Sequence, residues 1–560
     1  MERLRNTEEL QSLRDRLAAT QDGNKSCVRI CMTGCRARGA EQVRDAFREE
    51  LERQGLGDEV EVRETGCQGF CAQAPVIVVE PQGFFYQQLA PKDVSAVVSE
   101  TLKEGRVVER LLFPDPQSGQ RIVYESDIPF YRGQQKNVLR NCGVIDPTDI
   151  SGYIARGGYS ALEKVLGRMG PEEVVSQVTE SGLRGRGGAG FPTGRKWGFA
   201  RSAPGDVKYL VCNGSEGDPG AFMDRALMEG DPHSVLEGML IAAYAIGANT
   251  GYIYVGSQKP IAVEHLKIAL AQAQELGLVG ENILGSGFGF EIRIKEGAGA
   301  YVCGEETGLI ASLEGRTGEP RPRPPYPAVS GLWGKPTNIN NVETYANVPL
   351  IILNGADEYA SVGTEQGKGT KIFSLAGKVN NTGLVEVPIG IPLRDVVFDI
   401  GGGVPGGKKF KAVQMGGPSG GCVPEMHLSL PVDYGSLEAI GATMGAGGMV
   451  VMDEDTCMVD MALYFLSFLE GESCGKCVPC REGIRRMRQI LADISEGRGT
   501  EGDIERLERL ATAVADGSLC ALGGTAPNTV LSTIRYFRDE YDEHIKNHRC
   551  PAGICKALIS

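Results

Sequence analysis

The spacing of the cysteines constrains this chain more than any other feature of its sequence. Of sixteen cysteines in 560 residues, three stand in Cys474-x2-Cys477-x2-Cys480, and Cys520 follows further along the chain. Three thiolates on one turn with a remote fourth are typical of one [4Fe-4S] cluster. A tetrahedral zinc ion also accepts four thiolates. The close spacing favours the cluster, because its ligands are spread over separate irons.

A second set of cysteines predicts a [2Fe-2S] cluster. Cys31 and Cys35 form one pair and Cys67 and Cys71 another, each beside a predicted strand. Two pairs can serve one iron each, as this cluster requires. Cys27 is a rival ligand, but we favour Cys31 because a turn glycine separates it from Cys35. The alternative is a redox dithiol, although neither pair has the CxxC spacing that would support it.

The last cysteines predict a structural zinc site. Cys550 and Cys555 lie near the C-terminus together with His544, and Cys457 opens the preceding helical region. Three thiolates and an imidazole suit tetrahedral zinc, and His548 is a rival nitrogen ligand. The alternative is a group of buried free thiols, which are common. We expect simple packing for the isolated cysteines, namely Cys142, Cys212, Cys303 and Cys422.

The overall composition predicts a cytoplasmic, multidomain protein. At roughly 100–200 residues per domain, the chain should hold three to five domains. No apolar run reaches the ~18 residues that a bilayer span needs, and the charged N-terminus lacks the apolar centre of a signal peptide. The net charge of -14 argues against binding nucleic acid, whose phosphates would be repelled.

Hydrophobic periodicity divides the chain into α/β, β-rich and helical regions. The order of strands and helices over 1–110 resembles a thioredoxin-like fold, and 111–150 forms a linker. Alternating strands and helices predict an α/β domain over 151–365. Short strands between glycine clusters predict a β-rich domain over 366–450. Periodic apolar segments predict a helical bundle over 451–547, followed by a cysteine tail over 548–560.

Glycine-rich loops in the α/β region predict a nucleotide site. Gly185-x-Gly187-x-x-Gly190 matches the dinucleotide fingerprint, but a helical segment precedes it and Pro192 follows it. An ordinary Rossmann unit is therefore not expected. Backbone amides can still cradle phosphates there, although a plain glycine-rich turn is the alternative. Three nearby cations would help, namely Arg186, Arg195 and Lys196.

Further polar loops extend this predicted site. Asn213, Glu216 and Asp218 follow a buried strand at its carboxyl end, where open α/β sheets bind ligands. Glu305 and Glu306 lie in the first turn of a predicted helix. Taken singly, each acidic residue can instead cap a helix or face solvent. Side-chain amides able to read a flavin ring follow, namely Asn338, Asn340 and Asn341.

Five long motifs make the comparison with a known family specific. They are GRGGAGFPTGRKW, NGSEGDPGAFMDR, GAGAYVCGEETGLIASLEGRTGEPRPRPPYPA, GLWGKPTNINNVET and ESCGKCVPCREG. They resemble the NADH-binding flavoprotein subunit of respiratory complex I and of soluble NAD-linked hydrogenases and formate dehydrogenases. The resemblance covers about 125–545. Residues 27–105 are similar to that family's thioredoxin-like [2Fe-2S] domain, and its fusion here is more similar to the hydrogenase type.

The resemblance implies a fold and a set of ligand contacts. The fold is a thioredoxin-like domain, an atypical Rossmann-like FMN and NADH domain, a soluble-ligand-binding β-grasp domain and a four-helix-type [4Fe-4S] bundle. The implied FMN contacts are Gly185, Gly187, Lys196, Asn213, Glu216, Tyr301, Gly304, Glu305, Asn340, Asn341 and Thr344. The implied NADH contacts are Phe191, Phe199, Asp218, Glu306, Arg323 and Tyr326. Several of these depart from the family's pattern, namely Asp218, Arg323 and Tyr326.

We therefore expect an NADH dehydrogenase subunit that passes electrons from NADH through FMN to iron–sulfur clusters. No residue needs to act as a catalytic acid or nucleophile, because the cofactor carries the chemistry. The implied partners are a small thioredoxin-like [2Fe-2S] subunit and a larger iron–sulfur or catalytic subunit, such as a hydrogenase or formate dehydrogenase. Electron bifurcation stays open. The alternatives are a non-catalytic iron–sulfur relay or scaffold, and a β-grasp ligand sensor.

Overall fold

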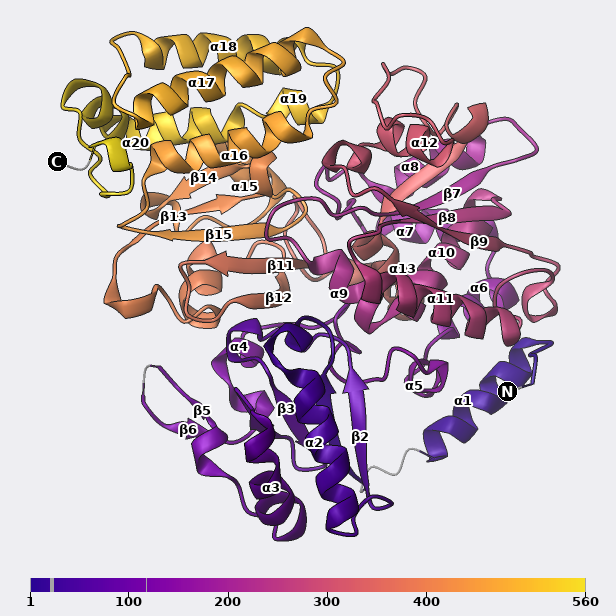
Figure 1. Ribbon diagram of the computed structural model, residues 1–560. Helices are drawn as coiled ribbons and strands as arrows, with labels where there is room; N and C mark the ends of the chain where they lie inside the picture. Colours follow the sequence, from indigo (N-terminus) through magenta and orange to yellow (C-terminus); the bar gives the residue numbers. More distant parts are fainter. Residues whose placement is uncertain (1, 21–24, 117, 559–560) are drawn as a thin grey trace.

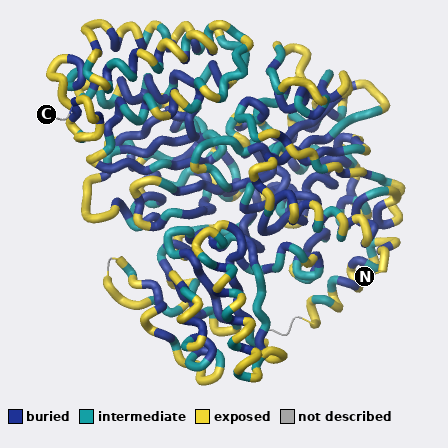
Figure 2. Tube along the Cα trace, in the orientation of Figure 1, coloured by how far each residue is buried: buried dark blue, intermediate teal, exposed yellow. Residues whose placement is uncertain are grey.

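The computed structural model describes residues 2–20, 25–116 and 118–558. Figure 1 shows the indigo thioredoxin-like domain below the junction of a magenta α/β domain and an orange β-grasp domain. The yellow helical domain covers the β-grasp sheet on the side away from the thioredoxin-like domain. Buried residues are concentrated along the strands and where the domains meet (Figure 2). Within the described ranges, no helix combines the length and apolar character that crossing a bilayer requires.

The thioredoxin-like domain contains a four-stranded sheet in the order β2-β1-β3-β4. Strand β1 runs parallel to β2 and antiparallel to β3. Helix α2 buries Val43, Phe47 and Leu51, whose spacing of four predicts this helix. The elements are β1 (Ser26–Cys31), α2 (Ala40–Arg53), β2 (Val60–Thr65), β3 (Ile77–Glu80), β4 (Phe84–Tyr86) and α3 (Val94–Ala96).

The α/β domain is the central domain of the molecule, and its parallel sheet has the order β10-β7-β8-β9. Parallel strands need crossover connections, which helices supply here. Asn341 at the end of β10 is the register partner of Asn213 near the end of β7, so the polar loops meet at one edge. The strands are β7 (Tyr209–Gly214), β8 (Thr250–Gly256), β9 (Glu291–Gly297) and β10 (Thr337–Asn341). The helices are α5 (Ile150–Ala155), α6 (Ser160–Arg168), α7 (Pro171–Glu180), α8 (Thr193–Ser202), α9 (Met223–Gly230), α10 (Pro232–Ile246), α11 (Pro260–Glu275), α12 (Glu306–Leu313), α13 (Val342–Asn354) and α14 (Ala356–Ala360).

The β-grasp domain has a mixed five-stranded sheet in the order β12-β11-β15-β13-β14, on which the helical domain packs through α20. The strands are β11 (Thr370–Gly377), β12 (Gly383–Pro388), β13 (Phe410–Met415), β14 (Gly421–Pro424) and β15 (Gly448–Asp453), with helix α15 (Tyr434–Ala439). The helical domain contains α16 (Met458–Glu472), α17 (Ile484–Ser495), α18 (Asp503–Gly517), α19 (Ala521–Thr525) and α20 (Asn528–Lys546). The predicted fold class is confirmed in each part.

The N-terminal helix α1 (Thr7–Thr20) lies elsewhere than its predicted domain. The boundaries 1–110 place it in the thioredoxin-like domain, whereas Leu10 and Leu13 are buried in the core of the central domain. The Leu4 amide donates to the Leu276 carbonyl at 2.9 Å. Periodicity predicts that this helix has an apolar stripe, but the surface that receives the stripe depends on the tertiary fold.

The predicted linker packs the thioredoxin-like domain against the β-grasp domain. Its elements are β5 (Phe113–Pro114), β6 (Arg121–Ile122) and α4 (Pro129–Arg132). Phe130 of α4 stacks on Phe70 with ring centroids 4.2 Å apart. The Gly69 carbonyl accepts from the Leu384 amide at 2.8 Å, and a Cβ on Gly383 would lie 1.9 Å from that carbonyl oxygen. Only glycine at 383 permits this approach of the two domains.

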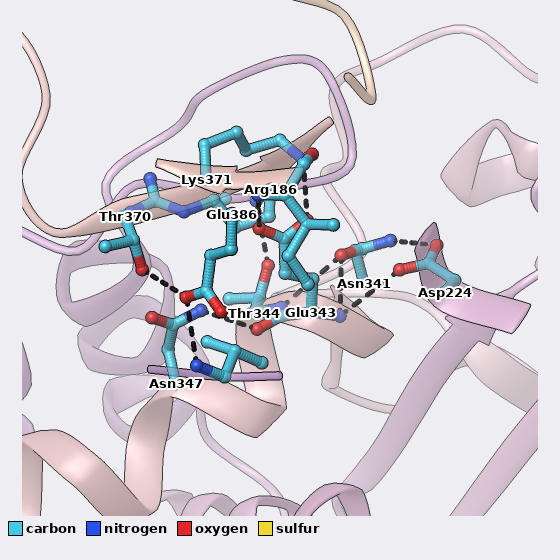
Figure 3. A network of polar contacts seen from close by, with 12 residues as sticks. Arg186, Asp224, Asn341, Glu343, Thr344, Asn347, Thr370, Lys371 and Glu386 are labelled. Carbon is cyan, nitrogen blue, oxygen red and sulfur yellow. Dashed lines mark hydrogen bonds and ion pairs between the residues drawn. The ribbon is translucent and has the colours of Figure 1, made fainter. Parts of the chain in front are cut away.

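A buried polar network joins the central and β-grasp domains (Figure 3). Glu343, in the first turn of α13, accepts from Lys371 Nζ at 2.6 Å and from the Ile372 amide at 2.9 Å. The side chains of Glu343 and Lys371 are 1% and 0% exposed. Glu386 accepts from the amides of Val138 and Leu139, which connects the linker to the same junction.

This network gives a stability prediction. Lys371→Met leaves the Glu343 carboxylate buried and unpaired, a change that costs about 3–5 kcal/mol when a buried ion pair is broken. We expect a lower unfolding temperature in thermal denaturation of the full chain. The double variant Glu343→Gln, Lys371→Met removes both charges and should recover much of that loss. Equal unfolding temperatures for Lys371→Met and the unaltered chain would contradict the role of the pair.

Candidate functional site

The polar loops converge at the carboxyl edge of the central sheet. Asn213 Nδ2 donates to the Gly304 carbonyl at 2.9 Å, which joins the end of β7 to the turn before α12. Asn341 caps α13 by accepting from the Glu343 and Thr344 amides. Its Nδ2 donates to Asp224 of α9 at 2.5 Å. Four separate segments therefore build one edge.

Two of the predicted acidic contacts serve as helix caps. Glu216 accepts from the amides of Asp224 and Arg225 at the start of α9, at 2.7 and 2.9 Å. Glu305 accepts from the Thr307 and Gly308 amides at the start of α12. This is the capping alternative that the sequence leaves open. Glu216 and Glu305 nevertheless lie at the site, because both helices begin at this edge.

A cationic cluster lies beside these caps. Lys196 of α8 pairs with Glu306 and also donates to the Ile339 carbonyl at 2.6 Å. Arg323 Nη1 lies 3.8 Å from Glu306 Oε2. The structure thus brings together one predicted FMN contact and two predicted NADH contacts. Thr344 instead accepts from the Arg186 amide and is fully buried.

The glycine loop 185–190 approaches this edge closely, but its arginine turns away. A Cβ on Gly187 would lie 3.0 Å from the Cβ of Asn341. Arg186 is buried and donates to the Tyr359 hydroxyl at 3.0 Å and the Lys368 carbonyl at 2.6 Å. Its guanidinium therefore anchors the junction of the central and β-grasp domains (Figure 3). The predicted help of Arg186 in binding phosphate is wrong for this reason.

An aromatic platform formed by Phe191 and Phe199 lies at the surface beside the glycine loop, and the predicted NADH contact Tyr326 is exposed as well. Phe191, Phe199 and Tyr326 are 44%, 52% and 58% exposed. The rings of Phe191 and Phe199 have centroids 6.5 Å apart, and the Arg195 guanidinium lies 5.9 Å from the Phe191 ring. Exposed aromatic rings close to each other mark a binding surface for an apolar or planar partner.

The interior of the edge contains polar groups and backbone without side chains. Asp218 Oδ1 is buried without a hydrogen-bond partner among the described residues, and burial raises the pKa of Asp218 to about 6. Asn340 Oδ1 accepts from Trp197 Nε1 at 2.9 Å, which orients the amide. A Cβ on Gly304 would lie 3.1 Å from Ser215 Oγ. An orphaned carboxylate oxygen, an oriented amide and side-chain-free backbone fit a flat, polar ligand such as FMN.

Four cysteines of the helical domain line one small cavity. Its lining includes Cys474, Cys477, Cys480, Cys520, Ser473, Lys476, Leu519, Leu522, Val302 and Pro320. Val302 and Pro320 belong to the central domain, so the cavity lies at the boundary of the two domains. Lys476 Nζ donates to the Pro320 carbonyl at 2.9 Å across it. Burial raises the pKa of Cys480 to about 11. This donor set fits a [4Fe-4S] cluster.

In the thioredoxin-like domain, Cys31, Cys35, Cys67 and Cys71 are brought together. Hydrogen bonds from Cys35 and Cys67 lower the pKa of Cys31 well below its usual value, and bonds to Cys31 and Cys71 raise that of Cys67. Cys27 lies apart from this group. Its pKa is raised to about 11, chiefly by burial, and its charged neighbours are Arg63, Glu61, Arg29 and Glu80. The geometry fits a [2Fe-2S] cluster on Cys31, Cys35, Cys67 and Cys71, without Cys27.

The C-terminal residues form a third compact group. The ligand atoms of Cys457, His544, Cys550 and Cys555 all lie within 4.8 Å of one another and all four residues are buried. His544 Nε2 is 3.5 Å from Cys457 Sγ and 3.4 Å from Cys555 Sγ. His544 Nδ1 lies 2.7 Å from the Glu540 carbonyl, which leaves Nε2 for a ligand role. His548 is not part of the group.

Comparison with known proteins identifies the family. The Nuo51 FMN-binding domain matches residues 178–350, the NADH-ubiquinone oxidoreductase-F iron-sulfur binding region matches 460–544, and the thioredoxin-like [2Fe-2S] ferredoxin matches 18–102. The chain is 47% identical to a subunit of the NADH-quinone oxidoreductase of Rhizobium meliloti over 414 residues, 74% of this chain and 98% of that protein. The chain belongs to the family of NADH-binding subunits found in NADH-quinone oxidoreductases and NAD-linked hydrogenases. It is an NADH dehydrogenase module with FMN, [4Fe-4S] and [2Fe-2S] sites, as the motifs predict.

Two further relatives extend the comparison to hydrogenases. The chain is 57% identical to the NADP-reducing hydrogenase subunit HndC of Solidesulfovibrio fructosivorans over 427 residues, 76% of this chain and 87% of that protein. A crystal structure of NAD+-reducing [NiFe]-hydrogenase in the H2-reduced state superposes with a TM-score of 0.65 at 28% identity, covering 97% of this chain and 90% of that chain. Family members therefore work within multisubunit complexes of more than one kind.

Sequence reasoning misses two charged residues of the site. Asp224 lies within the motif NGSEGDPGAFMDR, but the motif does not predict that it accepts a hydrogen bond from Asn341. Lys259 follows the stretch Ser257-Gln258 and contacts the loop after β7. No sequence motif links Asp224 or Lys259 to its partner, because each contact joins segments that are far apart in the chain.

The cysteine geometry gives a prediction about the first [2Fe-2S] ligand. Cys31→Ala should abolish the [2Fe-2S] electron paramagnetic resonance signal, because it removes one of four clustered thiols. Cys27→Ala is the matched control on the same strand and should keep the signal. The reverse result, with the signal lost only in Cys27→Ala, would move the site by four residues along β1.

Proposed function

We propose that this subunit takes electrons from NADH at the carboxyl edge of the central sheet and delivers them first to the [4Fe-4S] cavity. The observation that carries the proposal is the turn Tyr301–Gly304. The carbonyl of Gly304 holds Asn213, whereas Val302 lines the cavity of the four cysteines. Val302 and Gly304 are only two positions apart, so this turn connects the proposed FMN site to the cysteine cavity.

Bound FMN would supply the exchange between two-electron and one-electron transfer. The residues proposed to hold it are those of the loops, namely Gly185, Gly187, Lys196, Asn213, Glu216, Tyr301, Gly304, Glu305, Asn340, Asn341 and Thr344. The exposed aromatic platform would stack the rings of NADH, with Asp218, Glu306 and Arg323 beside it. These side chains bind and orient, and no acid or nucleophile is needed.

The [2Fe-2S] domain is proposed as a second port for electrons. Helix α9 begins at the Glu216 cap and ends at Gly230, where a Cβ on Gly66 would lie 2.3 Å from the Gly230 Cα. Gly66 immediately precedes Cys67. The helix has eight residues and therefore spans about 12 Å at 1.5 Å per residue. This length supports direct electron exchange between the two sites.

The parent assembly is proposed to be a cytoplasmic, multisubunit oxidoreductase. The relatives named for hydrogenases support a larger iron–sulfur or catalytic partner, such as a hydrogenase or formate dehydrogenase, together with a small thioredoxin-like [2Fe-2S] subunit. A second port in the fused domain is compatible with electron bifurcation. Identifying the chains that copurify with this one tests the choice of partner.

We also propose a structural zinc ion on Cys457, His544, Cys550 and Cys555. The group offers three thiolates and an imidazole, the donor set of closed zinc sites. Hydrogen bonds of His544 with Cys457 and the Glu540 carbonyl outweigh burial and raise the pKa of His544 to about 9, so zinc would have to displace a proton from this ring. Such an ion would fix the C-terminal tail to the start of α16 without redox activity.

The route through the cysteine cavity predicts the behaviour of Cys477→Ala. The variant should lose the [4Fe-4S] resonance signal while retaining FMN, because the flavin loops belong to another domain. NADH should still bleach the flavin absorbance, but NADH–viologen turnover should fall at least tenfold. Unchanged turnover would show that electrons leave elsewhere. A wild-type protein that binds no flavin would instead favour the relay alternative.

The zinc site predicts the behaviour of Cys555→Ala. Metal analysis should give about one zinc per unaltered chain and much less in the variant, with both cluster signals retained. The unfolding temperature should fall, because metal binding contributes folding energy. Cys422→Ala is the matched control, since Cys422 is buried but lies outside the group. Zinc-free wild-type protein would support the interpretation as free thiols.

A further inference from the structure

Lys259 lies beneath the loop that follows β7. It is the residue before α11, and its side chain is buried. Its ammonium donates to the carbonyl oxygens of Gly214 at 3.2 Å, Ser215 at 2.5 Å and Glu216 at 3.2 Å. An ammonium has three donors, and three consecutive carbonyls of one loop use them all.

The same ammonium compensates a buried carboxylate. Lys259 Nζ is 3.7 Å from Glu216 Oε2, and both side chains are shielded from solvent. Burial lowers the pKa of Lys259, and the carboxylates of Glu216 and Asp224 oppose that shift. Because a buried charge is costly unless it is paired, Lys259 compensates the Glu216 carboxylate that caps α9.

The three hydrogen bonds also fix the direction of the peptide groups. In a trans peptide the carbonyl and the following amide point in opposite directions. The amides of Glu216 and Gly217 therefore point away from Lys259, and neither donates a hydrogen bond to the part of the chain that the structure describes. Glu216 has a φ of 38°, in the left-handed region that non-glycine residues rarely adopt. A contact from outside the loop, namely Lys259, therefore holds it in this conformation.

This loop belongs to the edge proposed to bind FMN. A Cβ on Gly217 would lie 2.9 Å from the Tyr301 ring, and Asn213 holds the Gly304 carbonyl. Free amides and a nearby buried cation both stabilise negative charge more than neutral charge. Flavin gains negative charge when it is reduced, so both effects favour its reduced form.

We propose that Lys259 is a positioning residue that orients the loop 214–217, and thereby strengthens FMN binding and raises the reduction potential of the bound flavin. The proposal rests on the proposed FMN site. It concerns a residue that contacts the loop and not the reacting atoms. The proposal explains why Lys259 makes three hydrogen bonds to the loop, since the packing of α11 does not need them.

The test is Lys259→Met, which keeps the length of the side chain and removes the charge and the donors. In FMN-depleted full-length protein, we expect the dissociation constant for FMN, measured by fluorescence quenching, to rise at least tenfold. In the flavin-loaded protein, redox titration should show a tenfold loss of preference for reduced flavin, which is about 30 mV for a two-electron couple. Lys267→Met is the control on the same helix, because Lys267 is exposed and pairs with Glu296.

A second variant keeps the proposal testable if Lys259→Met does not fold. Lys259→Arg retains the charge but has a planar donor group that cannot reach three consecutive carbonyls in the same way. It should give a smaller shift in the same direction. A variant with a lower unfolding temperature but unchanged flavin affinity and potential would overturn the proposal. Wild-type protein that binds no FMN would instead refute the proposed function itself.

Discussion

The buried pair of Glu343 and Lys371 is the interaction on which the arrangement of the site depends. Glu343 lies in the first turn of α13, two residues after Asn341, and Lys371 lies on the first strand of the β-grasp domain. Two charges removed from water remain stable only in this fixed geometry. The β-grasp domain therefore does more than cover a surface. Through this pair and through the hydrogen bond of Arg186 to the Lys368 carbonyl, it holds the start of α13 and the glycine loop in place (Figure 3).

The site is built mainly from the beginnings of helices. Helices α9, α12 and α13 all start at the carboxyl edge of the central sheet, with side-chain oxygens of Glu216, Glu305 and Asn341 accepting from their first amides. The positive ends of three helix dipoles thus meet there. An edge of this kind suits phosphate groups and an electron-rich ring, and the carboxylate caps limit how positive the edge becomes.

Much of this molecule follows from local patterns, and the rest follows from contacts that no local pattern contains. The cysteine spacing predicts the two cluster motifs, and apolar residues four apart predict α2. The inward turn of Arg186 depends on Tyr359 and Lys368, which are far away in the sequence. The same holds for Lys259 beneath the loop after β7, and for α1 on the central domain. In each case the residue type is informative only once its neighbours in space are known.

The path of the chain around the thioredoxin-like domain has a consequence for how that domain could be separated. Helix α1 is anchored on the central domain before the chain enters the thioredoxin-like fold, and the linker returns the chain to the central domain afterwards. The domain is thus an insertion between two segments of one body. A single break in either connection would leave it attached through the other, so its exchange between molecules would require two cuts and the separation of the Phe70–Phe130 stack.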